Sequence, residues 1–263
     1  MSQPFDDELQ ARVEDAGINA SAPREQLWID GWLVRRCPGK AKRARCIQAV
    51  APGRMGIDDK LARSLSLYDD VGLRPFIRIT PFSQPRGLDA RLEQLGMERI
   101  DDTRVMIVAL PVARSHDGRP CAPLRYETTD ADTFSRWVGA ERGSTPSEQL
   151  AHAARLRESP VKHVAVFARD HADRVVAGGQ MAIEQQLAGL YDVNTPPAAR
   201  RLGHANALCR HLLTLAEQEG ARWAYLQVEA DNAAARSVYG RIGFTDAYSY
   251  HYRSPPATGV RTS

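Results

Sequence analysis

A strand, a turn rich in small residues and a helix follow one another between residues 189 and 220, and this order constrains the fold more than any other feature. Residues 189–193 alternate in the manner of a strand, and Thr195-Pro196-Pro197 ends it. From Ala205 onward apolar residues recur at helical spacing, and Gly220 is suited to end that helix. The sequence therefore predicts a strand and a helix joined by a turn at residues 200–205.

That turn is suited to hold an anion. The first amides of a helix have no partner inside the helix, and the helix dipole favours negative charge in front of them. Gly203 has no Cβ, so the backbone can approach a phosphate closely there. The spacing Arg-x-x-Gly-x-Ala is common by chance, so a plain connection between strand and helix remains an alternative.

A second strand and helix follow directly. Residues 222–229 read as a strand, and Asn232 is suited to cap the N-terminus of a helix. Ala235, Val238, Tyr239 and Ile242 share one face of that helix, which we expect to end at Gly243.

Taken together, the order Val193-x-Thr195, Arg200-x-x-Gly203-x-Ala205, Leu226-x-Val228 and Asn232-x-x-Ala235-x-x-x-Tyr239-x-x-x-Gly243-Phe244 resembles the GNAT (GCN5-related) N-acetyltransferase superfamily. The resemblance covers about residues 120–253. It implies an α/β (α+β) fold with a mixed, mostly antiparallel central sheet flanked by helices.

The resemblance also implies acetyl-CoA as cosubstrate. The residues that it assigns to cofactor binding are Asp192, Val193, Arg200, Arg201, Leu202, Gly203, His204, Ala205, Asn232, Ala235 and Tyr239. We expect the backbone amide of His204 to matter in the turn, and its ring to face solvent or the phosphates.

Acetyl transfer needs a neutral amine, a donor to the oxyanion and a proton for the leaving thiolate. The resemblance makes Tyr239 the general acid, although the same ring could simply be core. It makes the oxyanion donor a backbone amide near Asp192 or Val193. Glu184, Asp192 and Glu229 are the candidate bases because each falls near the end of a predicted strand, and spacing does not choose among them.

The first half of the chain repeats the order of the second. Two hairpins are predicted, from residues 32–36 with 43–50 and from residues 164–169 with 175–183. Residues 72–79 parallel 220–227, and residues 88–97 parallel 235–244, at an offset of about 148 residues. We therefore expect two tandem GNAT-like domains, at residues 1–111 and 119–263, joined by a linker at 112–118.

The first copy departs from the pattern at its turn. Residues 50–57 lack the Arg-x-x-Gly-x-Ala spacing, so this copy is expected to keep the fold without the cofactor. The second copy offers only one clear strand after Phe244, and we expect the apolar run at residues 105–110 to complete its sheet.

Composition and charge are those of an ordinary globular protein, with 43% hydrophobic residues, 25% charged residues and a formal net charge of +3. No membrane span, secretory signal or Cys/His cluster is evident, so we expect a cytoplasmic monomer or homodimer with no metal, membrane or nucleic-acid partner. Six basic residues crowd residues 35–45. They suggest either a nucleic-acid footprint or a solvated hairpin tip, and the second is favoured because no aromatic residues are interleaved.

The expected activity is transfer of an acetyl group from acetyl-CoA to a primary amine by direct attack in a ternary complex. The alternative is a non-catalytic module that binds or senses acyl-CoA. Two helices predicted at residues 133–142 and 147–157, with Trp137, Glu141, Arg142 and Arg155, are candidates for the acceptor site. Their charges do not indicate which amine is acetylated.

Overall fold

The computed structural model describes residues 5–113 and 122–256. The chain forms two compact units, one of residues 1–21 with 104–248 (unit 1) and one of residues 22–103 with 249–263 (unit 2). Both boundaries fall inside long strands, β5 (Glu98–Ala109) and β11 (Thr245–Ser254). Each of these strands therefore contributes to both units.

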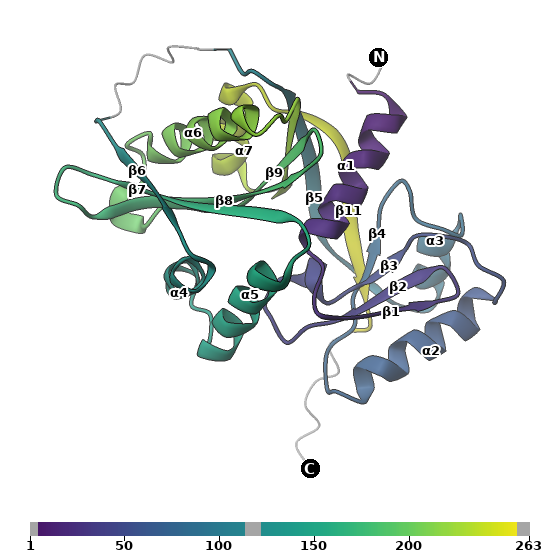
Figure 1. Cartoon of the computed structure of the whole chain (residues 1–263). Coiled ribbons are helices and arrows are strands. Elements are labelled where there is room, and N and C mark those ends of the chain that lie inside the picture. Colours follow the sequence, from purple (N-terminus) through teal and green to yellow (C-terminus); the bar gives the residue numbers. More distant parts are fainter. Residues whose placement is uncertain (1–4, 114–121, 257–263) are drawn as a thin grey trace. The chain divides into compact units, whose positions relative to one another are not determined.

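Unit 1 is a sheet with helices on both faces (Figure 1). Its strands follow the order β6-β7-β8-β9-β10-β5-β11. The neighbours from β6 to β9 pair antiparallel, whereas β9 and β10 run parallel. Besides the parts of β5 and β11, its elements are α1 (Asp7–Ala20), β6 (Arg125–Thr129), α4 (Ala131–Glu141), α5 (Pro146–Glu158), β7 (Lys162–Arg169), β8 (Val175–Glu184), β9 (Leu187–Asn194), η2 (Pro197–Ala199), α6 (His204–Gln218), β10 (Trp223–Glu229) and α7 (Ala233–Ile242).

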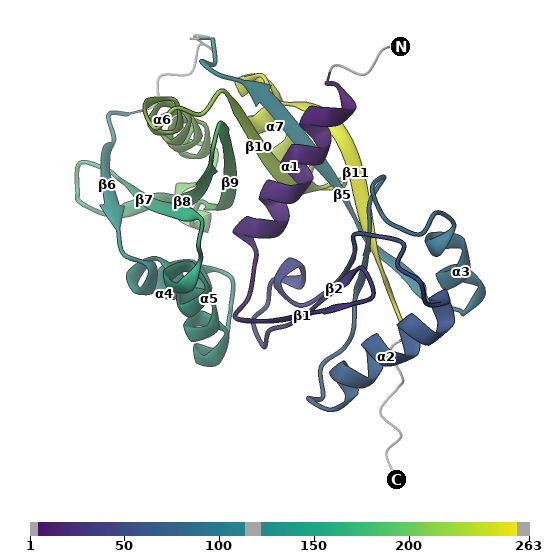
Figure 2. The ribbon, with the colours of Figure 1, turned by 45° about the vertical axis from the view of Figure 1, so that its right-hand side comes forward.

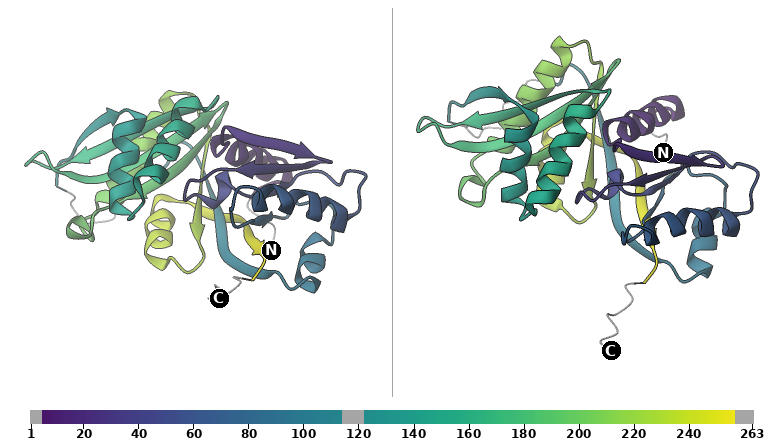
Figure 3. Two further views of the ribbon diagram at one scale, coloured as in Figure 1. Left: turned by 90° about the horizontal axis from the view of Figure 1, so that it is seen from below. Right: turned by 60° about the horizontal axis from the view of Figure 1, so that its bottom comes forward.

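Two consecutive glycines of β8 show which helices cover which face. A Cβ at Gly178 would meet the Trp137 ring of α4, whereas a Cβ at Gly179 would meet Leu208 and Leu212 of α6. Successive strand residues point to opposite faces, so α4 and α5 lie on one face of the sheet and α6 on the other. The paired helices α4 and α5 are visible together in both views of Figure 3.

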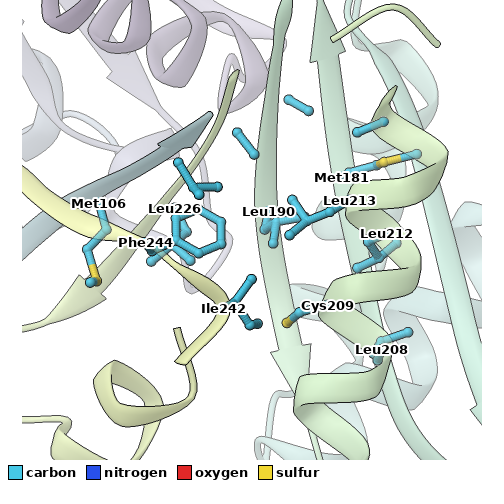
Figure 4. Packing of buried hydrophobic residues seen from close by; sticks show 14 of the residues in the cluster. Met106, Met181, Leu190, Leu208, Cys209, Leu212, Leu213, Leu226, Ile242 and Phe244 are labelled. Atoms are coloured by element: carbon cyan, nitrogen blue, oxygen red, sulfur yellow. The ribbon is translucent and has the colours of Figure 1, made fainter. Parts of the chain in front are cut away.

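The core of unit 1 lies between α6, α7 and the sheet (Figure 4). Leu208, Leu212 and Leu213 of α6 are buried against Leu190 and the other members of the same cluster. The predicted apolar face of this helix is confirmed, and so are the predicted strand before it and the glycine after it, Gly220, which is left-handed.

The prediction that residues 105–110 complete this sheet is confirmed as well. β5 lies between β10 and β11 in the strand order, and Met106 and Val108 belong to the buried cluster of unit 1. The strand is therefore an interior member of the sheet rather than a cover for its edge.

The N-terminal helix α1 was not predicted. Asp6 caps it, and Glu14 accepts a hydrogen bond of 2.8 Å from the Tyr248 hydroxyl. A Cβ at Gly17 would lie 3.0 Å from the Gln227 side chain, so this helix packs closely on the sheet of unit 1 (Figure 2). Alanine and glycine form much of its buried face, which makes the helical period weak in the sequence.

Unit 2 contains a smaller sheet in the order β1-β2-β3-β4-β11-β5. Its own elements are β1 (Glu25–Ile29), β2 (Trp32–Arg36), η1 (Lys42–Ala44), β3 (Ile47–Ala49), α2 (Ile57–Asp69), β4 (Ile77–Ile79) and α3 (Leu88–Gln94). The predicted strands at 43–50 and 72–79 exist but are shorter than expected, because a 3₁₀ turn takes residues 42–44 and Pro75 cannot donate to a ladder. Strand β1 was not predicted.

The basic stretch at residues 35–45 is not a solvated hairpin tip. Arg35 is 1% exposed, and its carbonyl accepts a hydrogen bond of 2.7 Å from the Tyr68 hydroxyl. The Lys42 and Arg45 side chains lie over the Phe76 ring, at 5.4 and 5.1 Å from its centroid. This ring is itself buried, so it offers no exposed face for a base to stack on.

The division into domains at 1–111 and 119–263, with a linker at 112–118, stays a prediction about where the two copies begin and end. The compact units do not follow these boundaries. Helix α1 and half of β5, from the first predicted domain, lie in unit 1, and the end of β11, from the second, lies in unit 2. Residues 114–118 of the linker lie outside the described residues. Among the described helices, none has the length and apolarity needed to cross a membrane.

Candidate active site

Strands β9 and β10 stop pairing before their carboxyl ends. Their parallel register pairs residues 187–190 with 223–226, and within the described residues it stops there. On the other side of β9, the pairing with β8 is interrupted between Gly178 and Gln180, and Asp192 has a left-handed φ of 54°. This bulge turns the end of β9 away from β10, which leaves backbone groups at the strand ends for an extended ligand.

The predicted turn follows β9 and enters α6. Gly203 is the N-cap of the helix with a φ of 84°, and Arg201 is also left-handed, at 63°. No side chain caps this helix, so its first amides are left for another partner. The Arg200 Nε donates to the Thr195 carbonyl at 3.1 Å, and Leu202 is 58% exposed at the tip.

Four buried side-chain atoms beside the turn have no hydrogen-bond partner within the described part of the chain. They are Asn194 Nδ2, Thr195 Oγ1, His204 Nδ1 and Asn206 Nδ2. Each such group costs free energy unless something pairs with it. Asn194 and Thr195 precede the turn and His204 and Asn206 lie in the first turn of α6, so these groups fit a polar ligand with phosphate or amide oxygens bound at the turn. The turn and these atoms suit a ligand that carries both phosphate and amide groups.

The His204 ring does not face solvent, which was one of the two orientations expected from the sequence, and the other orientation, toward the phosphates, stays a prediction. The residue is 6% exposed, because the first turn of α6 directs the ring into the protein. Ala205 follows it in the same turn and is half-buried.

Helix α7 brings the remaining predicted residues to this unit. The Asn232 Oδ1 accepts from the Ala235 amide at 3.1 Å, and Gly243 ends the helix with a left-handed φ, so both predicted helix signals are confirmed. Tyr239 packs edge-to-face against Phe244, with ring centroids 6.0 Å apart. Burial raises the pKa of Tyr239, so its phenol stays protonated at neutral pH.

Asp192 is held in a network on the α4 and α5 face. Arg142 Nη1 lies 2.5 Å from Asp192 Oδ1, Gln180 Nε2 donates to Oδ2 at 2.6 Å, and His152 Nε2 lies 3.3 Å from Oδ2. Burial acts to raise the pKa of Asp192, but the hydrogen bond from His152 and the Arg142 charge hold it well below its usual range. This carboxylate is therefore ionised and already paired, which makes it a weak base.

The other two candidate carboxylates lie in different places. Glu184 is at the far end of the β8 and β9 hairpin, where it accepts from Asn19 Nδ2 at 2.9 Å, and the structure does not bring it to the parting strands. Glu229 ends β10 with an exposed side chain, at the same edge as Asn194 because the two strands are parallel. Of the pair, only Glu229 remains close to the site.

The helices predicted at residues 133–142 and 147–157 exist as α4 and α5, and their role in an acceptor site stays a prediction. Two of the four residues named there, both arginines, have clear hydrogen-bond partners. Arg142 binds Asp192, while Arg155 Nη1 donates to the Ala20 carbonyl at 3.1 Å. Trp137 packs against Phe167, at 5.1 Å between centroids, and covers the sheet. His152 and Gln180 were missed, because a lone histidine or glutamine carries no spacing signal. The described residues contain no group of three His, Cys, Asp or Glu placed to hold a metal ion.

The turn of the first copy is filled by the protein itself. The amides of Arg54 and Met55 donate to the Asp30 carboxylate at 2.7 to 2.9 Å. Lys60, whose side chain is fully buried, donates to the Asp30 and Pro52 carbonyls and lies 3.1 Å from Asp30 Oδ2. A Cβ at Gly53 would lie 2.1 Å from the Asp30 carbonyl oxygen, so no room is left there for a phosphate.

We expect this contact to make the stability of unit 2 depend on pH. The backbone hydrogen bonds from Arg54 and Met55 lower the pKa of Asp30 to about 2. Its contribution is then complete above the unfolded value of about 3.9 and is lost as pH falls through about 2. Measured by denaturant unfolding, the stability difference between the wild type and Asp30→Asn should be full at pH 5 and shrink toward pH 2. A difference that does not change over this range would contradict the role of the carboxylate.

Solved structures share this fold. A GCN5-related N-acetyltransferase from Kribbella flavida superposes with a TM-score of 0.67 at 16% identity, covering 94% of this chain and 95% of that one. A tandem GNAT protein from the clavulanic acid biosynthesis pathway gives 0.56 at 15% identity, covering 97% and 96%. The family model described as "Probable histone acetyltransferase Rv0428c C-terminal" matches residues 10–253. The chain belongs to this GNAT acetyltransferase family.

Relatives of this GNAT enzyme carry acetyltransferase names with different acceptors. The uncharacterized N-acetyltransferase YobR of Bacillus subtilis (strain 168) is 27% identical over 87% of this chain and 91% of its own length. The mycothiol acetyltransferase of Corynebacterium diphtheriae is 36% identical, over 45% of this chain and 41% of its own. The chain is thus an acetyltransferase of the GNAT type. The GNAT family, the fold class and the enzyme class expected from the sequence are confirmed, whereas the loss of the cofactor site from the first copy stays a prediction.

Proposed function

We propose that this enzyme transfers an acetyl group from acetyl-CoA to a primary amine, by direct attack while both are bound. The observation that carries the proposal is the set of unpaired groups where β9 leaves β10, beside an uncapped helix N-terminus. Amides of the first turn of α6 would hold the pyrophosphate, with Arg200 and Arg201 nearby, and the end of β9 would pair with the pantetheine. The coenzyme supplies the thioester.

In this proposal the backbone near Asp192 and Val193 donates to the oxyanion, because the bulge frees amides there. Tyr239 gives its proton to the leaving thiolate. Asn232 and Ala235, in the first turn of α7, line the same side of the coenzyme. The amine nitrogen forms a bond to the carbonyl carbon, the carbon–sulfur bond breaks, and the nitrogen releases the proton that balances the one given to sulfur.

The proposal assigns one coenzyme site to each chain. Asp30 takes the place of an anion in the turn of the first copy, whereas no side chain of residues 5–113 or 122–256 caps the helix at Gly203. Titration calorimetry with acetyl-CoA should give one equivalent per chain. Two equivalents would contradict the loss of the site in the first copy.

Turnover is tested by incubating the protein with acetyl-CoA and each of spermidine, phenylethylamine, lysine and alanine amide while free thiol is measured. Release of thiol that depends on one amine, with the acetylated amine found by mass spectrometry, is expected. Binding of acetyl-CoA without any acetylated amine, here and in a wider amine screen, would instead support a module that senses acyl-CoA. Alanine amide is included because several relatives are named ribosomal protein bS18-alanine N-acetyltransferases.

Replacement of Gly203 by leucine should weaken acetyl-CoA binding by about 100-fold or more. The new side chain would stand before the first amides of α6 and would require a φ of 84° that leucine rarely adopts. Calorimetry measures the loss. Gly220→Leu is the matched control, because Gly220 has a φ of 89° at the other end of α6 with open space around it. This control should lower the melting temperature yet keep the affinity for acetyl-CoA. An equal loss of acetyl-CoA affinity in both variants would contradict the assignment of the turn at Gly203 to phosphate binding.

A further inference from the structure

The acceptor amine needs a base, and the network around Asp192 offers one that the proposed function has not used. Asp192 itself is a poor choice because both of its oxygens are engaged, Oδ1 by Arg142 and Oδ2 by Gln180 and His152. A carboxylate held in this way serves better to orient a neighbour than to take up a proton.

Two histidines border this network, and their hydrogen bonds set them apart. His163 uses both ring nitrogens, Nδ1 with Gln180 Oε1 at 3.2 Å and Nε2 with Ser159 Oγ at 3.2 Å. Burial, above all, lowers its pKa to about 4, so it remains neutral and occupied. In the part of the chain that the structure describes, the polar contacts of His152 are made by Nε2, with Asp192 and with Gln180 at 3.4 Å.

The position of His152 suits a base at the parting strands. It lies on α5 with 18% of its side chain exposed, and it touches the residue that forms the bulge of β9. The charge of Arg142, which binds Asp192, also acts on the Tyr239 phenol. Arg142 thus links the Asp192 network electrostatically to the phenol that the proposed function makes the general acid.

We propose that His152 is the catalytic base, which takes the proton of the acceptor ammonium at Nδ1 while its Nε2–H donates to Asp192. Asp192 is then a positioning residue that fixes the tautomer and stabilises the imidazolium. This inference rests on the proposed function. The ammonium nitrogen loses one proton to His152, and its free electron pair attacks the thioester carbon. The carbon–sulfur bond then breaks and the thiolate takes the proton of Tyr239, while the nitrogen gives up its second proton, which restores the phenol. His152 releases the first proton to solvent.

The charges around His152 are mixed. The charged groups of this network are Asp192 on β9, Arg142 at the end of α4 and Arg155 on α5, and His163 on β7 is neutral. Phe134 on α4 faces the ring edge-on at 6.4 Å and carries no charge.

The kinetic test compares the wild type with His152→Gln, using the amine of the panel that is acetylated fastest. Glutamine can still bond to Asp192 but cannot take up a proton. We expect kcat/KM to fall by about 10²- to 10⁴-fold and the acidic limb of its pH profile to disappear, with acetyl-CoA affinity unchanged by calorimetry. His171→Gln, in an exposed turn between β7 and β8, is the matched control. It should keep the wild-type kcat/KM and the acidic limb of the pH profile. Wild-type turnover with the same acidic limb in His152→Gln would overturn the proposal.

A second measurement does not depend on turnover or on a folded variant. Long-range proton–nitrogen NMR of the wild type at pH 8 should show His152 as the Nε2–H tautomer, which leaves Nδ1 to take up the proton. The Nδ1–H tautomer, with Nε2 accepting from Gln180, would overturn the proposal. Failure of the proposed function has a different signature, namely no acetyl-CoA binding or no acetylated amine in the wild type, with the tautomer still reporting on His152.

Discussion

Tyr239→Phe should lower turnover by about 10²- to 10⁴-fold, the usual range for a positioned acid, with little change in acetyl-CoA affinity. The substitution keeps the edge-to-face contact with Phe244 and removes only the hydroxyl that would protonate the thiolate. Steady-state kinetics and calorimetry on the same preparation measure the two quantities. Tyr126→Phe is a suitable control, since it removes a phenol from the edge strand β6 and should keep full activity.

The opposing interpretation treats Tyr239 as core. It expects near-normal turnover in Tyr239→Phe, and a loss of about 3–5 kcal/mol in the free energy of unfolding only when Tyr239→Ala removes the ring. Melting temperatures and turnover of both variants separate the two interpretations. Full activity in the phenylalanine variant would remove Tyr239 from the mechanism and leave the proton to come from water.

Residues 119–263 expressed alone should be insoluble or poorly folded. This fragment lacks β5, which lies between β10 and β11, and with it Met106 and Val108 of the core of unit 1. It also lacks α1, so Tyr248 loses the Glu14 carboxylate that it donates to. Two strands would then have no partner between them, and their open edges favour aggregation.

Solubility and circular dichroism measure this outcome, and co-expression of residues 1–118 with 119–263 provides its control. The two pieces together contain every element of both units, so they should assemble into a soluble complex that binds one acetyl-CoA. A fragment 119–263 that is soluble and binds acetyl-CoA by itself would contradict the role of β5 and α1.

The elements that could be predicted from the sequence are those with a clear local periodicity of apolar residues or a clear capping residue. The leucines of α6, the glycines at its two ends and the Asn232 cap of α7 each report on their own neighbourhood, and the structure has all of them where the sequence indicated. The run at residues 105–110 was predictable for another reason, because the second copy lacked a strand and this segment was apolar enough to supply one.

The rest depended on contacts between residues far apart in the chain. His152, Gln180 and Asp192 meet because α5, β8 and β9 pack together, and the carboxylate prediction could not tell that Arg142 would neutralise Asp192 or that Glu184 would lie at the other end of its hairpin. The turn of the first copy was seen to be unusual. The sequence did not indicate that the Asp30 carboxylate would fill this turn by accepting from amides 24 and 25 residues further along the chain.

The contact between Glu14 and Tyr248, 234 residues apart, has a consequence for protein synthesis. The ribosome makes α1 more than 200 residues before its partners on β10 and β11, so this helix leaves the exit tunnel long before it has a surface to pack on. Its buried face consists of few large apolar residues, with alanine and glycine prominent among the rest. A helix of this kind can be exposed to solvent during translation without associating with other chains, whereas a leucine-rich helix in the same position would favour aggregation until its partners were made.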